Sequence, residues 1–228
     1  MEPIAELFDR MDAWRHFPNY QLERRADIFF SLYLAEVLEA KLGFAVSREL
    51  APEFPVRIGT IYADVPIDKS YKIDYLAMSA DGTRPIFVEL KTEGASRRAS
   101  QDKYLVASQS VGLVALLDGL LDIYRATKAK RKYFSLLIQL ERMNLIRIPA
   151  SLGDIMAGST LQGSTEASRA IEVAAAAVER PRIVYVQPHG DGPDAISFQE
   201  FADEVGRHSD LVSQRFAASL REWAEVPA

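Results

Sequence analysis

Three charged residues within the stretch KIDYLAMSADGTRPIFVELKTE have types and spacing that suit chemistry. Glu89 and Lys91 are two positions apart in an apolar segment, and Asp74 precedes Glu89 by fifteen positions. Residues i and i+2 of a β-strand point to the same face, so Glu89 and Lys91 are expected side by side. A hairpin at the intervening DGT would bring Asp74 across from Glu89. The stretch therefore predicts two carboxylates and one ammonium group on one sheet surface, at the edge of an open cleft.

Two carboxylates this close repel each other unless a cation lies between them. Oxygen ligands of this kind suit magnesium or manganese (Mg2+ or Mn2+), which take one or two carboxylates together with water and substrate phosphate. Such an ion polarises a phosphate and lowers the pKa of a bound water, while a nearby lysine can orient that water or stabilise the transition state. The chemistry implied is hydrolysis of a phosphodiester bond.

The acid-x-Lys sequence by itself is weak, because it occurs again at Glu39 and Lys41. That second pair falls on a predicted helix, where residues i and i+2 diverge. Context distinguishes Glu89 and Lys91, which have an acid on the preceding strand, a hairpin between and a helix after. A structural salt bridge of Lys91 with Glu89 or Asp74 remains an alternative explanation of the same residues.

Hydrophobic spacing predicts the elements that position these residues. A helix is expected from about Tyr20 to Leu42, ending at Gly43, and one or two strands with irregular joins follow it. KIDYLAMSA and RPIFVELKT are the clearest strands, and a long helical pattern comes after them, interrupted or bent near Gly112 or Gly119.

The rest of the chain predicts strands and helices in alternation. KYFSLLIQL is expected to be a buried central strand, followed by a loop or broken helix and an Ala-rich helix before residue 180. PRIVYVQP predicts another strand, and a closing helical segment begins with a capping box of Ser197 and Glu200. The order indicates an α/β fold with a mixed central sheet flanked by helices, in a single domain of residues 1–228.

The order and the charged residues together resemble the PD-(D/E)xK nuclease superfamily. The matching residues are Ile73 and Asp74, then Glu89, Leu90 and Lys91, and after them SQDKYL, where Gln101 and Tyr104 are similar to the Gln-x-x-Tyr element of the RecB-like branch. Ile73 stands where the superfamily often has proline. The resemblance implies a restriction-endonuclease-like three-layer core at about residues 20–140, with a C-terminal strand and extra C-terminal helices in residues 141–228.

The resemblance also implies roles for individual residues. Asp74 and Glu89 would be metal ligands, with the carbonyl of Leu90 as a further one, and Lys91 would be the catalytic lysine. Gln101 and Tyr104 would contact substrate phosphate or the active-site water.

Helical spacing places Arg97, Gln101, Tyr104 and Ser108 on one polar stripe, which would line the cleft, and the other faces of the helix carry apolar residues, Val106 among them.

Many members of the superfamily carry an acid on the first core helix. Glu36 is the candidate here as a third metal ligand, because it lies beside the buried stripe of the predicted helix. Glu23, Asp27 and Glu39 compete with it, and a solvated glutamate at the edge of the helix explains Glu36 equally well.

Charge is distributed unevenly along the chain. The net charge is −5, which alone disfavours a nucleic-acid partner, yet nine basic and four acidic residues between Lys91 and Lys132 give that segment +5. Arg97, Arg98 and Lys103 are the candidate nucleic-acid contacts. DNA is expected as the partner rather than RNA, and the oligomeric state is left open, a homo-oligomer included.

Composition limits the other function classes. There is no cysteine and there are only three scattered histidines, so thiolate chemistry is excluded and a zinc centre is not expected. A reducing cytoplasm fits best, with neither a secretory signal nor a membrane span expected. Two functions follow, a Mg2+-dependent nuclease or a catalytically silent nucleic-acid-binding or assembly protein on the same scaffold.

Overall fold

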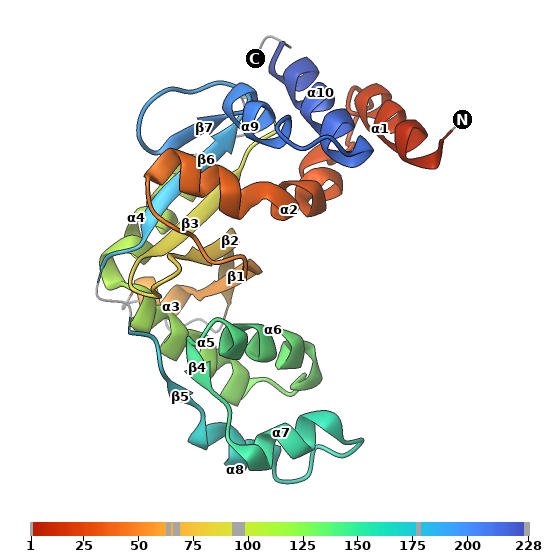
Figure 1. Ribbon diagram of the computed structural model, residues 1–228. Coiled ribbons are helices and arrows are strands. Elements are labelled where there is room, and N and C mark those ends of the chain that lie inside the picture. Colours follow the sequence, from red (N-terminus) through yellow and green to blue (C-terminus); the bar gives the residue numbers. More distant parts are fainter. Residues whose placement is uncertain (1, 63–64, 66–68, 93–98, 177–178, 226–228) are drawn as a thin grey trace. The chain divides into compact units, whose positions relative to one another are not determined.

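The structure, a computed structural model, describes residues 2–62, 65, 69–92, 99–176 and 179–225. Within them the chain is α/β, and its largest sheet has five strands in the order β1-β2-β3-β6-β7 (Figure 1). The sheet is mixed, because β1 pairs antiparallel with β2 whereas β6 pairs parallel with β7. These strands are β1 (Ala51–Arg57), β2 (Ser70–Met78), β3 (Pro85–Leu90), β6 (Arg182–Gln187) and β7 (Ala195–Ser197). The predicted α/β class with a mixed sheet is confirmed.

The chain divides into two compact units, which are described separately. The first comprises Met1–Val46, Val88–Ala99 and Val184–Ala228, and the second comprises Ser47–Phe87 and Ser100–Ile183. The expected single domain, with its core at about residues 20–140, stays a prediction.

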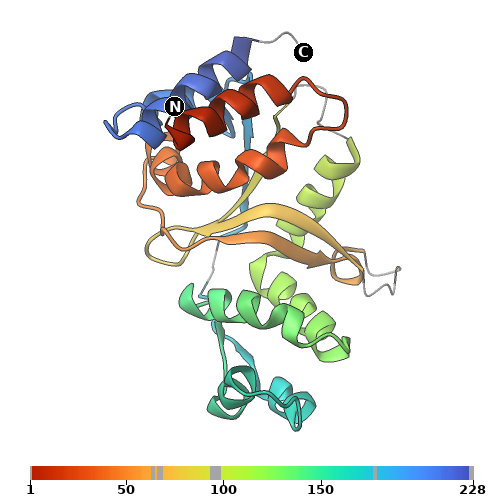
Figure 2. The same ribbon diagram turned by 90° about the vertical axis from the view of Figure 1, so that its right-hand side faces the viewer.

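Helices from both ends of the chain build the first unit. They are α1 (Pro3–Trp14), α2 (Leu22–Leu42), α9 (Phe198–Val205) and α10 (Leu211–Glu225). Helix α1 lies against α10 and α2 against α9, and Figure 2 shows the red α1 alongside the blue α10. Aromatic rings fill the space between them: the centroid of Phe30 is 5.0 Å from that of Phe201 and 5.2 Å from that of Phe216.

The predicted limits of the helices in this unit are largely confirmed. Helix α2 ends at Gly43, whose φ of +76° is the left-handed conformation that favours glycine at a helix end. Ser197 and Glu200 form the predicted capping box, and the closing helical segment is divided into α9 and α10. Asp12 joins the two chain ends by accepting hydrogen bonds from Trp223 Nε1 at 2.8 Å and Ser219 Oγ at 3.0 Å.

The second unit surrounds the β1–β2 ladder with helices. Helix α5 packs on β1 and on α3, and the ladder places the buried Phe54 opposite the buried Ile73. Its other elements are α3 (Ile58–Ile61), α4 (Ala99–Val111), α5 (Leu113–Ala126), α6 (Arg131–Arg142), β4 (Ile146–Arg147), α7 (Ala150–Ala157), α8 (Ser164–Ala167), η2 (Ser168–Ala170) and β5 (Glu172–Val173). Strands β4 and β5 form a separate two-stranded sheet.

Gly112 bends the long helical segment, as predicted. Its φ is +82°, and the helices before and after it are inclined by 106°. No single helix of the described residues is long and apolar enough to cross a membrane; this bent pair reaches the necessary length and composition only when its two helices are taken together.

Two expectations for the second unit are wrong. KYFSLLIQL lies in helix α6 rather than in a strand, and its buried residues Phe134, Leu137 and Leu140 recur every three positions along one helix face. The Ala-rich segment does not begin as a helix, since Ala174 to Ala176 follow β5 in irregular backbone.

The turn between β2 and β3 is closed by Asp81, the acid of the predicted DGT turn. Its Oδ1 accepts hydrogen bonds from Ser79 Oγ at 2.5 Å, Thr83 Oγ1 at 2.8 Å and the Thr83 backbone N–H at 3.0 Å. These bonds, that from Ser79 foremost, hold the pKa of Asp81 at about 2, below its ordinary 3.8. The turn that joins the strands carrying Asp74 and Glu89 therefore favours the ionised form of Asp81.

Gly119→Ala is expected to lower the free energy of unfolding by about 1–3 kcal/mol, because overpacking a close helix contact forces neighbours to move. A Cβ at this position would lie 2.1 Å from Thr60 Oγ1. Gly153→Ala is the matched control, since nothing lies within 4 Å of its added Cβ, and it should be neutral or stabilising by up to about 1 kcal/mol. Urea unfolding measures both, and equal stability of the two variants would contradict the close contact.

Asp81→Asn should remove one acid-sensitive contribution to stability. Because the folded pKa is depressed, the stabilisation by Asp81 is complete above the unfolded value of 3.8 and is lost as pH falls through about 2. The difference in unfolding free energy between wild type and Asp81→Asn, measured by urea titration at a series of pH values, should shrink across that interval. A difference that stays constant there would show that the turn does not depend on the charge.

Candidate active site

Glu89 and Lys91 lie at the end of β3, in the first unit. All six residues of β3 are buried. The Lys91 backbone N–H donates to the carbonyl oxygen of Val186 in β6 at 2.8 Å, so hydrogen bonding to the neighbouring strand continues past the end of β3. The backbone on which both side chains stand is therefore fixed on one side by β6.

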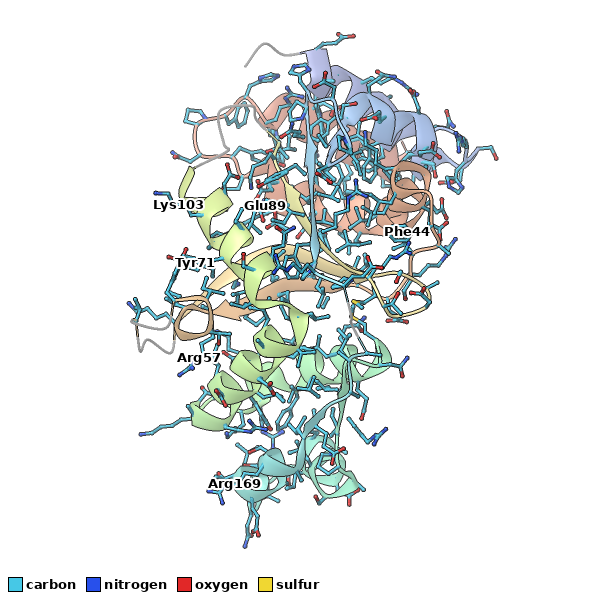
Figure 3. All side chains as sticks on the ribbon, turned by 90° about the vertical axis from the view of Figure 1, so that its left-hand side faces the viewer. Phe44, Arg57, Tyr71, Glu89, Lys103 and Arg169 are labelled. Atoms are coloured by element: carbon cyan, nitrogen blue, oxygen red, sulfur yellow. The ribbon has the colours of Figure 1, made fainter. Side chains whose placement is uncertain are left out.

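The two side chains meet, as the i, i+2 spacing predicts. Lys91 Nζ donates to Glu89 Oε1 at 2.8 Å and to the carbonyl oxygen of Leu90, also at 2.8 Å. Glu89 is 1 % exposed and Lys91 is 4 % exposed (Glu89 is labelled in Figure 3). The pairing is thus confirmed, whereas the expected exposure at the edge of an open cleft is wrong for these two residues.

Burial makes this ion pair costly to form. Removing a carboxylate and an ammonium group from water costs several kcal/mol for each ion, and their attraction offsets this only when geometry and hydrogen bonding are good. Apolar residues of similar size would fill the end of β3 without that cost. A strand that is otherwise apolar therefore keeps two charges for which core packing alone gives no reason.

The pair also gathers two oxygen atoms around one cationic group. Glu89 Oε1 and the Leu90 carbonyl oxygen both accept from the same ammonium group. A carboxylate and a backbone carbonyl are hard oxygen ligands, which Mg2+ and Mn2+ accept together with water and substrate phosphate. The end of β3 therefore presents two oxygen atoms of the kind that such an ion accepts, both bonded here to the Lys91 ammonium group.

Asp74 lies on β2, in the second unit, and its side chain is partly buried. Glu89 and Lys91 belong to the first unit. The predicted approach of Asp74 to Glu89 stays a prediction.

Helix α4 carries the remaining residues of the predicted site, except Arg97 and Arg98, which lie outside the described residues. Gln101 is partly buried and Lys103 is exposed. Tyr104 is 5 % exposed and its hydroxyl donates to the carbonyl oxygen of Lys72 at 3.0 Å.

The helix face expected to line a cleft lies largely in the interior. Ser108, on the predicted polar stripe with Gln101 and Tyr104, is buried and donates to the Tyr104 carbonyl oxygen at 2.7 Å. Val106, which spacing assigned to the apolar faces, is 53 % exposed.

Glu36 contacts a histidine that sequence reasoning gave no role. Glu36 Oε2 is 2.8 Å from Nε2 of His208, which lies between α9 and α10. Of its competitors, Glu39 accepts a hydrogen bond from the Val46 backbone N–H at 2.8 Å. Across the described parts of the chain, no group of three or more His, Asp or Glu side chains is arranged to hold a metal ion. The role of Glu36 as a metal ligand stays a prediction.

Sequence reasoning also missed Tyr71, whose ring stacks on that of Tyr104 with centroids 4.6 Å apart. The signal was available in the strand period. Tyr71, Ile73 and Tyr75 alternate along β2 and share one face. Tyr71, near the start of the strand, therefore extends the apolar row of that face.

No protein-family model, no curated protein and no solved structure matches this chain. The resemblance to the PD-(D/E)xK superfamily therefore rests on its short motifs alone.

Lys91→Met should lower the free energy of unfolding by about 3–5 kcal/mol in EDTA, because it leaves the Glu89 carboxylate buried without its ammonium partner. Glu89→Gln combined with Lys91→Met should cost less than the sum of the two single changes. Lys41→Met is the control, since Lys41 forms a more exposed ion pair with Glu200, and it should cost about 0–1 kcal/mol. Strictly additive effects at Glu89 and Lys91 in urea unfolding would contradict the coupling.

Proposed function

We propose that this protein is a metal-dependent nuclease that hydrolyses DNA phosphodiester bonds with Mg2+ or Mn2+. One observation carries the proposal: the buried Lys91 ammonium group lies 2.8 Å from both Glu89 Oε1 and the Leu90 carbonyl oxygen. The end of β3 thus carries two oxygen atoms that suit a divalent ion, and next to them a lysine that suits phosphate chemistry. The sequence around that point is the acid-x-Lys element of the resemblance.

The roles of the residues follow from their chemistry. Glu89 and the Leu90 carbonyl would hold the ion, which supplies polarisation of a phosphate and a bound water of lowered pKa. Lys91, released from those oxygens, would orient the attacking water or stabilise the negative charge of the transition state. Asp74 is proposed as the second carboxylate, and Gln101 and Tyr104 as contacts near the substrate.

The finer fold assignment belongs to the same proposal. A restriction-endonuclease-like core of three layers agrees with the five-stranded mixed sheet and with a helix, α4, that follows the charged strand.

Burial of the pair favours a second candidate function. With Glu89 1 % and Lys91 4 % exposed, a phosphate reaches them only after neighbouring residues move. A catalytically silent protein that binds nucleic acid or serves in an assembly would keep the pair closed. The two candidates differ in whether a metal ion can take the place of the ammonium group.

Cleavage assays test the first candidate. Purified protein with Mg2+ or Mn2+ should degrade DNA supplied in single-stranded, double-stranded and branched forms, with RNA as a comparison. Lys91→Ala and Glu89→Gln should each lower the rate by about two orders of magnitude or more, since each removes a charged group that acts in the transition state. Lys41→Ala, at the other acid-x-Lys sequence, should retain full activity.

The effect of Mg2+ on the melting temperature is a second test of the same proposal. Mg2+ should raise the melting temperature of Lys91→Ala more than that of wild type, because the Glu89 carboxylate no longer has the ammonium group as a competitor. Glu89→Gln should show little effect, and sodium chloride of equal ionic strength is the salt control. Binding of DNA without cleavage, together with no specific Mg2+ effect on any variant, would favour the silent protein.

A further inference from the structure

Two tyrosine rings form a parallel stack in the second unit, and neither belongs to the buried ion pair. The ring of Tyr71 on β2 lies on that of Tyr104 on α4, with centroids 4.6 Å apart and planes inclined by 5°. Other aromatic pairs, such as Phe30 with Phe201 at 81°, meet edge to face in the apolar core. In the Tyr71–Tyr104 pair the rings are instead nearly parallel, and Tyr71 is 38 % exposed.

Tyr104 is held in place and supports the stack from beneath. It is 5 % exposed, and its hydroxyl donates to the Lys72 carbonyl oxygen at 3.0 Å. The acceptor belongs to the residue next to Tyr71 on the same strand, so the bond fixes α4 to β2 where the rings meet. One face of Tyr71 is thereby covered by a ring that cannot easily turn away.

Tyr71 presents the rest of its ring to solvent. It is 38 % exposed, whereas Ile73 and Tyr75, on the same face of β2, are 0 % and 4 % exposed. The apolar row along the strand thus ends in an aromatic ring at the surface. Tyr104 covers one face of this ring, and 38 % of the Tyr71 surface remains exposed.

Lysine residues lie close to both tyrosines along the chain. Lys69 precedes Tyr71 by two positions, Lys103 directly precedes Tyr104, and both lysines are exposed. Lys72 pairs with Glu53 on the neighbouring strand β1. Figure 3 shows the side chains of Tyr71 and Lys103 on the same side of the second unit. An aromatic face among ammonium groups matches a ligand that combines a planar ring with negative charge.

The geometry points to Tyr71 as a stacking platform for an unpaired base of single-stranded nucleic acid, with the exposed Lys103 near an adjoining phosphate. Proteins bind single strands by combining basic residues along the backbone with aromatic rings under the bases. A paired base is covered on both faces within a duplex, so only an unstacked or terminal base offers a face to Tyr71. The choice of nucleic acid as ligand rests on the proposed function, which it narrows to substrates with a single-stranded segment.

Binding measured without hydrolysis tests the platform. Fluorescence anisotropy of a fluorescein-labelled oligodeoxythymidylate, in EDTA, should show binding by wild type and an affinity about 5- to 100-fold lower for Tyr71→Ala. Tyr71→Phe and Tyr71→Trp should bind as wild type, because they keep an aromatic face. Val106→Ala is the matched control, since it removes an exposed apolar side chain from α4 without touching a ring. Thermal melting confirms that each variant is folded.

Several results would overturn the platform. They are absence of binding by wild type, a Tyr71→Ala affinity equal to that of Val106→Ala, or a Tyr71→Phe affinity as low as that of Tyr71→Ala. An equal loss of affinity for the fully paired duplex of the same sequence would also contradict it. Failure of the nuclease proposal is distinct, because Tyr71-dependent binding in EDTA without any cleavage in Mg2+ would retain the platform and remove the enzyme.

Discussion

A carboxylate and an ammonium group buried together at the end of a central strand constrain the rest of the candidate site. Neither Glu89 nor Lys91 has solvent to stabilise its charge, so each needs the other within hydrogen-bonding distance. The Leu90 carbonyl oxygen accepts a second hydrogen bond from the same ammonium group, and the Lys91 backbone is tied to Val186 of β6. The position of the pair is therefore set by the sheet itself rather than by a loop that could adjust to a ligand.

This constraint gives the two candidate functions a common physical basis. In the closed arrangement the ammonium group neutralises the carboxylate, and the strand end is stable without any ligand. A divalent ion held by Glu89 and the Leu90 carbonyl would neutralise the carboxylate in place of Lys91, and the displaced ammonium group would then need another anionic partner, which a substrate phosphate would supply. A chain that only needed stability would gain by replacing both groups with apolar residues, which is often neutral or stabilising at such sites.

Much of the fold could be predicted because local patterns and tertiary packing agree. Side-chain period predicts strands β2 and β3. Residues that favour particular backbone conformations predict the end of α2 at Gly43, the bend at Gly112 and the capping box at Ser197. The sequence predicts a strand where helix α6 lies, because a short continuous apolar run has the same composition in a strand and in a buried helix, and only packing along one face distinguishes them.

The candidate site was predictable in part for the same reason. Strand period fixes which side chains share a face, so the Glu89–Lys91 contact could be derived from spacing alone. Segments that are distant in the sequence determine what covers that face of the strand. The burial of the pair could therefore not be derived from the local sequence.

Tyr104 shows how the same limit changes the interpretation of a short motif. The Gln-x-x-Tyr spacing suggested a hydroxyl aimed at phosphate, but the hydroxyl donates to the Lys72 carbonyl and the ring supports Tyr71. A hydroxyl already engaged by the backbone is expensive to redirect toward a ligand, because the carbonyl oxygen would lose its partner in a partly buried place. The part of Tyr104 that remains useful for recognition is therefore its aromatic face, which acts through Tyr71. A tyrosine at this position would then contribute by holding a neighbouring ring flat, and phenylalanine in its place would keep the stack while releasing the anchor between α4 and β2.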